Sequence, residues 1–444
     1  MRGIVIAGTG SGVGKTSIST GLMSLLSKRY KVQAYKVGPD FIDPMYHTAA
    51  TGRPSRNVDS FLMSDDIIRN VVGHTGSDAD ICVVEGVRGL YEGFTGDGDT
   101  GSSAYVAKLL GFPVILVIDV GSLTRSAAAI VNGFRAFDPE VRIAGVILNK
   151  VSGQQHGDKV GVAMRTYCSD ITVVGRIPKT SKAVPQRHLG LAVPDMRGGP
   201  FLEPFEELAY HIDSDEVMSI AEEASADLPV KSPYYVRDAS ATAAVPVDDA
   251  YCFYYRDNLD CLRASGIEPR FFSPVAGDPI PDADMAYLGG GYPELHAEEI
   301  SRNLDFLEGL ANMAAEGKPV MGECGGMMTM CRSTTDKEGR EFAMSGILPA
   351  RSEFVSIRHG PTYVMAEATR ENPFFAGYTI GHEYHYSETC PDEGGTYGYK
   401  VNRGLGIADR RDGLIAGNAM GTYMHQHALS YRDWAKGFVD CLRR

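Results

Sequence analysis

A glycine-rich turn between a strand and a helix is the feature that most constrains how this chain can fold. The apolar run Gly3–Ala7 leads into AGTGSGVGKTS, in which Gly12, Gly14, Lys15 and Thr16 precede or open a helical segment. Such a turn lets backbone N–H groups close around phosphate oxygens, and the helix start adds partial positive charge. The pattern predicts a P-loop that binds ATP, with Lys15 at the β- and γ-phosphates and Thr16 as a ligand of Mg²⁺.

The spacing of this motif departs from the strict P-loop rule at one position. The residue five before Gly14 is Thr9, and the expected glycine lies one residue earlier, at Gly8. A glycine-rich strand-to-helix turn that binds no nucleotide is the alternative interpretation. The Lys-Thr pair directly after a glycine at a helix start favours the phosphate site.

Short apolar runs alternate with helix-period segments through the first half of the chain. This rhythm predicts a mostly parallel sheet covered by helices. The expected helices include Lys15–Lys28 and Thr124–Phe134. The expected strands are rich in Val and Ile, as buried parallel strands are, and lie at Gly3–Ala7, Val32–Val37, Ile81–Val84, Val114–Ile118 and Ala144–Leu148.

The periodic pattern dissolves over residues 224–246, where small residues, proline and charge are mixed. We therefore expect a linker at 224–246 between an ATP-binding domain at 1–223 and a second α/β domain at 247–444. Strand-like runs resume at Tyr251–Tyr255 and Met285–Leu288, and a helix is expected at Ser301–Ala315.

Composition limits the classes of function. The 444 residues, 43% hydrophobic and 22% charged, suffice for two or three domains with buried cores. With 43 Lys and Arg against 56 Asp and Glu, the net charge of −13 argues against nucleic acid as a main partner. Eight cysteines without a CxxC pair argue against a disulfide scaffold or a zinc ribbon. We recognise no signal peptide and no membrane-spanning stretch, so we expect a cytoplasmic protein with no membrane partner.

Acidic residues follow the second and third strands of the predicted sheet. Asp40 and Asp43 lie in KVGPDFIDP, and Glu85 and Glu92 lie in EGVRGLYEG. Ligands gather at the carboxyl ends of parallel strands, so these acids should face the P-loop. Asp40 and Glu85 are predicted to complete the metal site with the P-loop threonine, whereas helix capping is an equal alternative for Asp43 and Glu92. Asn149, which ends a later strand, is predicted to contact adenine.

The second half carries a thiol motif. Cys324 lies in GECGG, the thiol version of a nucleophile elbow, with a buried packing cysteine as the alternative. A thiol nucleophile needs a base, which His425 of GTYMHQH offers. Gly290 and Gly291 of GGGYPE follow a strand and are predicted to supply N–H groups to an oxyanion. The cluster GHEYHYS lacks further metal ligands, so we expect it to contact substrate or to form hydrogen-bonded structure.

These motifs, in this order, resemble the cobyrinate a,c-diamide synthase family, which includes the archaeal form that also acts as Ni-sirohydrochlorin a,c-diamide synthase. The resemblance covers nearly the whole chain. It implies an α/β protein with an N-terminal P-loop, dethiobiotin-synthetase-like domain and a C-terminal class I (triad) glutamine amidotransferase-like domain. It rests on AGTGSGVGKTS, YKVGPDFIDPMYHTAATGRPSRN, VVEGVRGLYEG, SLTRSA, LGGGYPEL, GECGGMM, GHEYHYSE and GTYMHQH.

The resemblance also implies residue roles. Cys324 would be the glutaminase nucleophile, and His425 would raise its nucleophilicity. The acidic residues of the synthetase site would be Asp40, Asp43, Glu85 and Glu92. Many triad amidotransferases place Glu two residues after the histidine, but this chain has His427 there, so the third triad member stays open.

The implied reaction has two halves. ATP would convert a carboxylate to an acyl phosphate, which ammonia released from glutamine would attack. The expected partners are glutamine, ATP and a tetrapyrrole polycarboxylate (cobyrinate, Ni-sirohydrochlorin or both, in cobalamin or coenzyme F430 biosynthesis), and a homodimer is left open. Arg53, Arg56 and Arg88 are predicted to bind substrate carboxylates, with surface solubility as the alternative. Alternative functions are cobyric acid synthase-type amidation of other corrinoid carboxylates, and a P-loop regulatory switch with an inert amidotransferase domain.

Overall fold

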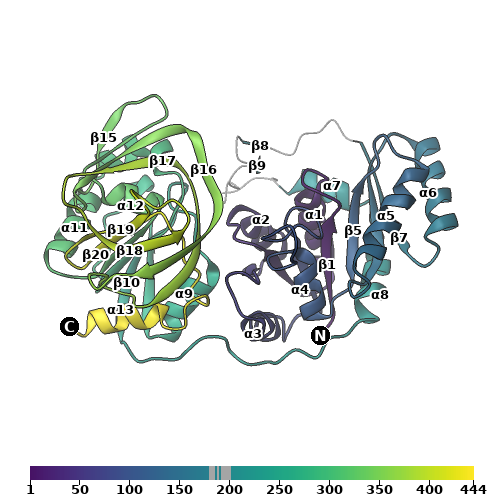
Figure 1. The fold of residues 1–444 in the computed structure, drawn as a ribbon, viewed down its shortest axis with the longest axis horizontal. Coiled ribbons are helices and arrows are strands. Elements are labelled where there is room, and N and C mark those ends of the chain that lie inside the picture. The colour runs from purple at the N-terminus through teal and green to yellow at the C-terminus, as the bar shows by residue number, and fades with distance from the viewer. Residues whose placement is uncertain (180–185, 188–189, 192–201) are drawn as a thin grey trace. The chain divides into compact units, whose positions relative to one another are not determined.

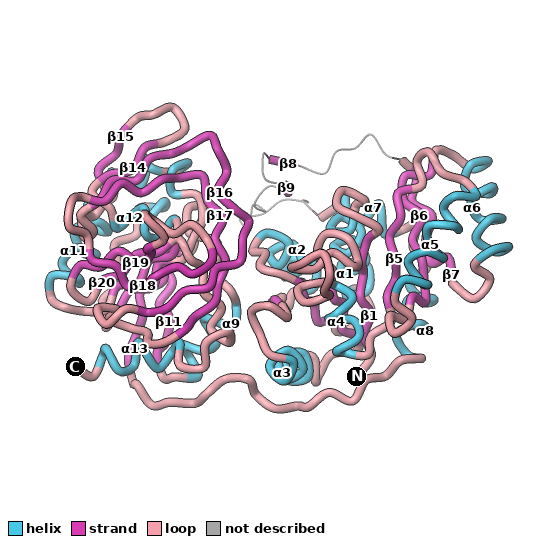
Figure 2. Tube along the Cα trace, viewed as in Figure 1, coloured by secondary structure: helices cyan, strands magenta, loops and turns pink. Residues whose placement is uncertain are grey.

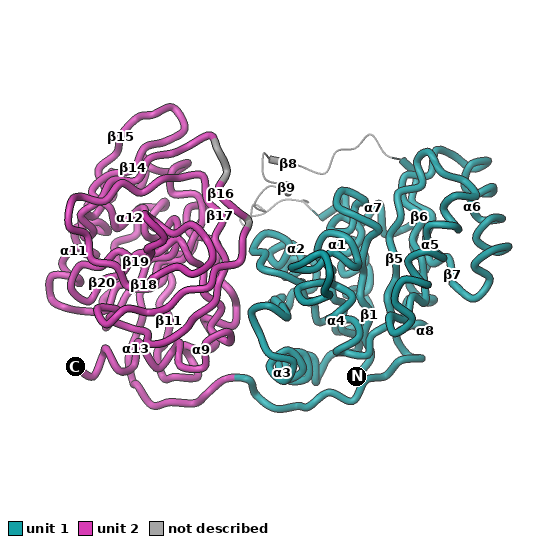
Figure 3. The backbone as a smooth tube through the Cα atoms, viewed as in Figure 1, with its two compact units in different colours: residues 1–233 teal, residues 234–444 magenta. Residues whose placement is uncertain are grey.

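The computed structural model describes residues 1–179, 186–187, 190–191 and 202–444 (Figure 1). These residues form two compact units, Met1–Pro233 and Tyr234–Arg444, which Figure 3 colours separately. Both units combine a sheet with covering helices (Figure 2). Of the helices that the structure describes, none has the length and apolar character needed to cross a membrane.

The first unit contains a seven-stranded parallel sheet in the order β3-β2-β4-β1-β5-β6-β7. Strands β1, β2 and β4 are buried along their whole length because helices cover both faces of the sheet, which explains the apolar runs of β1 and β4. The strands are β1 (Gly3–Gly8), β2 (Val32–Val37), β3 (Arg56–Val58), β4 (Ile81–Glu85), β5 (Val114–Asp119), β6 (Ile143–Val151) and β7 (Thr172–Pro178), with a short separate pair of β8 (Gln186–Arg187) and β9 (Gly190–Leu191). The helices are α1 (Lys15–Ser27), α2 (Ile42–Thr51), α3 (Asp65–Thr75), α4 (Ser103–Leu110), α5 (Arg125–Phe137), α6 (Gln154–Tyr167), α7 (Glu203–Ala209) and α8 (Ser214–Glu222).

The strand order determines where this unit can bind a ligand. Strand β1 lies between β4 and β5, and β2 lies on the far side of β4. The loops that leave β1, β2 and β4 therefore open at one edge of the sheet, on neighbouring strands. Those loops carry the P-loop and both acidic motifs.

The second unit contains a mixed eleven-stranded sheet in the order β11-β10-β12-β13-β20-β19-β18-β16-β14-β15, with β17 paired to β16. Strands β11, β10, β12, β13 and β20 are parallel, and the long hairpin of β16 and β17 is antiparallel. The strands are β10 (Ala241–Pro246), β11 (Ile267–Phe272), β12 (Met285–Leu288), β13 (Val320–Glu323), β14 (Ser333–Thr335), β15 (Glu341–Ala343), β16 (Ala350–Ala368), β17 (Tyr378–Pro391), β18 (Thr396–Arg403), β19 (Arg411–Ala416) and β20 (Ala419–Thr422). The helices are α9 (Arg256–Ala264), α10 (Ala297–Arg302), α11 (Leu304–Ala315), α12 (Gly325–Met330) and α13 (Trp434–Leu442), with short 3-10 turns η1 (Pro274–Ala276) and η2 (Pro293–Leu295).

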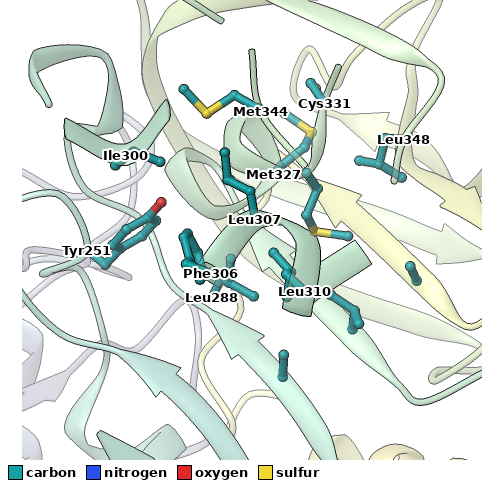
Figure 4. Close-up of a cluster of buried hydrophobic side chains, with 14 of the residues drawn as sticks. Tyr251, Leu288, Ile300, Phe306, Leu307, Leu310, Met327, Cys331, Met344 and Leu348 are labelled. Atoms are coloured by element: carbon teal, nitrogen blue, oxygen red, sulfur yellow. The ribbon is translucent and has the colours of Figure 1, made fainter. Parts of the chain in front are cut away.

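A buried apolar cluster holds helix α12 against this sheet (Figure 4). Met327 of α12 lies among Leu288 of β12, Leu310 of α11 and Leu348, all nearly inaccessible to solvent. Close packing of this kind resists movement of the helix. It therefore fixes the turn that enters α12, where Cys324 lies.

The structure differs from the expected linker of 224–246. Residues 241–246 form β10, an inner strand paired with β11 and β12, so the second domain begins before residue 247. Because Ala243, Ala244 and Val245 are completely buried, their small size reflects tight packing and not an exposed linker. The first unit likewise extends past 223, to Pro233.

Two further expectations in this unit are corrected. The expected strand Tyr251–Tyr255 is a loop: among the residues that the structure describes it makes a single antiparallel bridge, between Phe253 and Gly290, and the Phe253 ring packs against Tyr292. The expected helix Ser301–Ala315 is two helices, because Asn303 stops α10 and its side chain accepts a hydrogen bond from Phe306 N to start α11.

Candidate active sites

The P-loop joins β1 to α1, as expected. Gly12 and Gly14 have φ of 77° and 96°, a region that glycine adopts without steric cost. The Lys15 ammonium folds back over the loop and donates a hydrogen bond to the Gly10 carbonyl at 3.2 Å. Burial and, next, the nearby Lys36 ammonium lower the pKa of Lys15 to about 8. A bound phosphate would stabilise the charged form of Lys15, so the lysine favours binding of an anion above the loop.

A cluster of buried charges lies beside the first turn of α1. Thr16 Oγ1 is 2.7 Å from Glu85 Oε1 and 3.2 Å from Asp43 Oδ2. The Lys36 ammonium lies 2.6 Å from Asp43 and 2.8 Å from Glu85. His47 Nε2 is 2.7 Å from the other oxygen of Glu85. A hydroxyl and two carboxylates therefore converge at the carboxyl ends of β2 and β4.

The cluster contains more carboxylates than the one ammonium can neutralise. Burial opposes ionisation of Glu85, but the charge of Lys36 and the hydrogen bond with His47 hold the pKa of Glu85 below its usual range. Burial and, next, the Asp40 carboxylate raise the pKa of Asp43 well above its usual range. Burial also opposes the charge on Lys36, yet the surrounding carboxylates raise its pKa. A divalent cation with oxygen ligands would relieve this excess of negative charge.

Asp40 does not reach this cluster in the way that the sequence suggested. Its Oδ1 accepts hydrogen bonds from the backbone N–H groups of Ile42 (2.9 Å) and Asp43 (3.0 Å), so it caps the start of α2. Asp40 precedes the helix, whereas Asp43 lies in its first turn and faces β4. The two residues therefore exchange their expected roles, and Asp43 joins Thr16 and Glu85.

Asn149 supports the P-loop from strand β6. Its amide donates a hydrogen bond to the Val13 carbonyl at 2.8 Å, and its oxygen accepts one from Lys150 N at 2.8 Å. A Cβ at Gly14 would lie only 2.6 Å from Asn149 Nδ2. Each polar atom of the amide thus has a partner within the protein, and the contact of Asn149 with adenine stays a prediction.

The remaining expected substrate residues are scattered. Arg53 forms an ion pair with Asp78 at 2.7 Å and also donates to Gln33, so its guanidinium is used to hold the loop after α2. Arg56 is buried in β3. Arg88 and Glu92 are exposed in the loop after β4, where Arg88 has a φ of 45°.

In the second unit, Cys324 lies at the turn between β13 and α12. Its φ of 48° is unusual for a residue with a side chain, and its N–H donates to the Thr422 carbonyl at 2.7 Å. A Cβ at Gly326 would collide with the carbonyl of Leu288, so glycine is required for α12 to approach β12 this closely. Cys324 Sγ lies 3.9 Å from the Tyr384 carbonyl of β17. These contacts confirm that the segment is a sharp, strained strand-to-helix turn.

His425 lies just after β20, the strand next to β13. Its backbone exchanges two hydrogen bonds with His382 (2.8 and 3.1 Å), and the two rings stack with centroids 5.0 Å apart. A Cβ at Gly290 would lie 2.5 Å from His425 Cε1, and one at Gly325 would lie 3.1 Å from Gly291 N. The glycine loop after β12 thus contacts both the histidine and the residue that follows Cys324.

The two glycines of this loop differ in their backbone. Gly290 donates its N–H to the Phe253 carbonyl at 3.3 Å, so the expected oxyanion role does not suit it. Gly291, beside Gly325, is the better placed of the two.

The surroundings of Cys324 favour the neutral thiol over the thiolate. Burial and, next, the Glu294 carboxylate raise the pKa of Cys324, so the thiol needs a base to react. Burial also raises the pKa of Glu294 to about 7. For His382, burial and then His425 lower the pKa well below its usual range, so the ring is neutral.

The GHEYHYS cluster forms hydrogen-bonded structure. His385 donates from Nδ1 to the Ser387 carbonyl at 2.7 Å and stacks on Tyr423 with centroids 3.7 Å apart. Across the residues that the structure describes, no group of three or more His, Cys, Asp or Glu side chains is arranged to hold a metal. Any divalent ion at the P-loop would therefore also need oxygens from the nucleotide.

Comparisons with known proteins agree with this division into two sites. Residues 4–191 match the CobQ/CobB/MinD/ParA nucleotide binding domain, and residues 242–433 match the CobB/CobQ-like glutamine amidotransferase domain. The chain is 40% identical to the cobyrinate a,c-diamide synthase of Methanosphaera stadtmanae, with 99% of both chains covered. It is 41% identical to that of Methanothermobacter thermautotrophicus (98% of both) and 41% identical to that of Methanocaldococcus jannaschii (99% of both). The chain belongs to the cobyrinate a,c-diamide synthase family.

This membership confirms the expected fold class and makes the chain a glutamine-hydrolysing carbon–nitrogen ligase. Solved structures are similar over about half of the chain. A glutamine amidotransferase from Thermotoga maritima has 15% identity and a TM-score of 0.31, covering 47% of this chain and 84% of its own. McdA of Cyanothece has 14% identity and a TM-score of 0.29, covering 48% and 99%.

Sequence reasoning missed two residues of this chain that the structure places in the phosphate site. Lys36 and His47 both contact Glu85 and are nearly inaccessible to solvent. A signal for Lys36 was present, since a lysine inside the buried strand VQAYKV requires a charged partner. His47 lies in α2 and has no comparable signal, because only the packing of α2 brings it to β4.

Proposed function

We propose that this protein amidates the a and c acetate side chains of cobyrinate, with ATP and glutamine, in cobalamin biosynthesis. The observation that carries the proposal is the presence, in one chain, of a P-loop beside a carboxylate cluster and of a strained thiol turn beside a histidine. Full-length similarity to enzymes of that name supports the choice of substrate.

The phosphate site suits activation of a carboxylate. The P-loop N–H groups and the Lys15 ammonium would bind the β- and γ-phosphates of ATP. A hydroxyl and carboxylates are the ligands that Mg²⁺ prefers, so Thr16, Asp43 and Glu85 fit this ion, which supplies charge neutralisation when bound. A substrate carboxylate oxygen would attack the γ-phosphorus, ADP would leave, and the product is an acyl phosphate. Ammonia would then displace phosphate to form the amide.

The thiol site suits release of that ammonia. His425 would accept the proton of Cys324 Sγ, and the thiolate would attack the side-chain amide carbon of glutamine. The Gly291 N–H would stabilise the oxyanion. The imidazolium would return the proton to the leaving nitrogen, which departs as ammonia and leaves a thioester. Water would hydrolyse the thioester to glutamate and the free thiol.

The identity of the tetrapyrrole is best tested by the products. The purified enzyme is incubated with ATP, Mg²⁺ and glutamine and with either cobyrinate or Ni-sirohydrochlorin, and the products are analysed by mass spectrometry. We expect cobyrinate to gain two amides. Two amides on Ni-sirohydrochlorin would assign a role in coenzyme F430 biosynthesis as well.

A control separates catalysis from the alternatives. Cys324→Ala with an ammonium salt in place of glutamine should give the same diamide. Amidation of cobyrinate a,c-diamide instead of cobyrinate would favour the cobyric acid synthase alternative. Absence of any amide product from all substrates would favour the regulatory switch.

A further inference from the structure

The sequence left open which residue acts with Cys324 and His425 as the third member of the triad. His427 occupies the position two residues after His425, but it makes a separate pair. Its Nδ1 accepts a hydrogen bond from Leu429 N at 3.2 Å, and its Nε2 lies 3.4 Å from Asp257 Oδ2. Asp257 in turn accepts a hydrogen bond from the Tyr234 hydroxyl at 2.6 Å. His427 therefore contributes to a buried structural pair.

A different carboxylate faces His425. Glu323 is the last residue of β13 and directly precedes Cys324, and its Oε2 lies 3.4 Å from His425 Nδ1. Both side chains are almost completely buried, with 2% of each exposed. Parallel pairing of β13 with β20 sets this contact, because Glu323 is in register with Thr422, three residues before the histidine. Glu323 also accepts a hydrogen bond from Gln426 N at 3.5 Å.

Two other buried carboxylates of the second unit are used elsewhere. Asp412 accepts hydrogen bonds from the Thr422 hydroxyl (2.6 Å) and from the N–H groups of Tyr423 (3.0 Å) and Met424 (3.0 Å). Glu383 accepts from the N–H groups of Leu405 and Gly406. These carboxylates stabilise turns, whereas Glu323 has an imidazole nitrogen beside it.

We propose that Glu323 is the positioning residue for His425, the group that completes a Cys324–His425–Glu323 triad. With Nδ1–H donated to Glu323, the lone pair of His425 lies on Nε2. A Cβ at Gly290 would lie 3.3 Å from Nε2, so this nitrogen is on the side of the glycine loop, whose next residue, Gly291, lies beside Gly325 of the thiol turn. The carboxylate also stabilises the imidazolium that forms when the thiol loses its proton.

The inference rests on the proposed glutaminase role of Cys324 and His425, and its test separates the two. Glutamate release from glutamine is measured from pH 5.5 to 9.5 on the full chain with ATP, Mg²⁺ and cobyrinate. For Glu323→Gln we expect kcat to fall about 10²- to 10⁴-fold with little change in the KM for glutamine, because the amide removes the charge and favours the wrong tautomer. The rise of kcat/KM on the acid side of the pH profile (the acid limb) should also move to lower pH, because loss of the carboxylate makes the imidazolium less stable.

Asp257→Asn is the matched control, because it removes a buried carboxylate beside the other histidine. It should lower thermal stability but leave the acid limb in place. An equal shift of the limb in Asp257→Asn, or wild-type kcat in Glu323→Gln, would overturn the role of Glu323 while leaving the glutaminase assignment intact. Glutamate release by Cys324→Ala would instead overturn the glutaminase assignment itself.

Should Glu323→Gln fail to fold, the same measurements are made on Glu323→Asp, whose shorter side chain withdraws the carboxylate from Nδ1. A fall in kcat of at least about tenfold at constant KM supports the positioning role. A kcat equal to that of the wild type overturns it.

Discussion

The two candidate sites use charge in opposite ways. Beside the P-loop, Lys36 lies within ion-pair distance of Asp43 and Glu85, and His47 contacts Glu85 as well. Around Cys324 the pKa values favour a neutral thiol and a neutral His382. The first site is suited to bind a polyanion and a cation, which requires fixed charges. The second must move one proton, which requires groups that gain or lose charge easily.

The two turns also differ in which residues adopt positive φ. The P-loop reaches positive φ at Gly12 and Gly14, where the missing side chain leaves room for phosphate. The thiol turn reaches a φ of 48° at Cys324, which carries the reactive group. Of these two turns, only the thiol turn holds a residue with a side chain at positive φ, and that residue presents the reactive group.

The largest expected effect tests whether the two sites are chemically independent. In Cys324→Ala, glutamine-dependent amidation and glutamate release should fall by about 10⁴-fold or more, because no other group forms the thioester. Amidation with an ammonium salt should remain near the wild-type rate. Both rates are measured by product formation. Loss of the ammonia-dependent reaction would show that the thiol site also serves the phosphate site.

A complementary change removes charge from the first site. Lys15→Ala should lower amidation with either nitrogen source by about 10³-fold, because the ammonium at the β- and γ-phosphates is lost. Some glutamate release should persist, because the thiol site does not contain Lys15. ATP-driven amidation at the wild-type rate would refute the role of the P-loop lysine.

The exchanged roles of Asp40 and Asp43 give a matched pair. Asp43→Asn should reduce amidation by about 10²-fold and weaken its dependence on Mg²⁺, because a carboxylate beside Thr16 is lost. Asp40→Asn keeps the helix cap and should leave the Mg²⁺ dependence unchanged, while Asp40→Ala should lower the free energy of unfolding by about 1 kcal/mol. Magnesium titrations and thermal unfolding distinguish these outcomes. A larger magnesium effect at Asp40 would reinstate the assignment made from sequence.

The smallest effect concerns pH. The pKa of Lys15 is lowered to about 8, so the free enzyme loses this proton as pH rises through 8, whereas bound phosphate favours the charged form. Affinity for ATP should therefore weaken above about pH 8, by at most about tenfold per pH unit. Calorimetric titration at pH 7, 8 and 9 measures it. In Lys15→Arg this pH dependence should vanish, since arginine stays charged.

The sequence predicted most of the first unit because its inner strands β1, β4 and β5 are nearly continuous apolar runs. It failed at residues 241–246, where buried Ala and Pro look like a linker, and at Tyr251–Tyr255, where aromatic side chains resemble a strand. In the second unit, small or aromatic residues pack in ways that a hydrophobic pattern does not distinguish.

By itself, the sequence determined the P-loop and the thiol turn, because each depends on the conformations of a few consecutive residues. Only the tertiary structure decided that Asp43 and not Asp40 faces Thr16, that Lys36 lies between two carboxylates, and that Glu323 faces His425. Those contacts depend on which strands are neighbours and in what register, and strand order is set by the packing of the whole sheet.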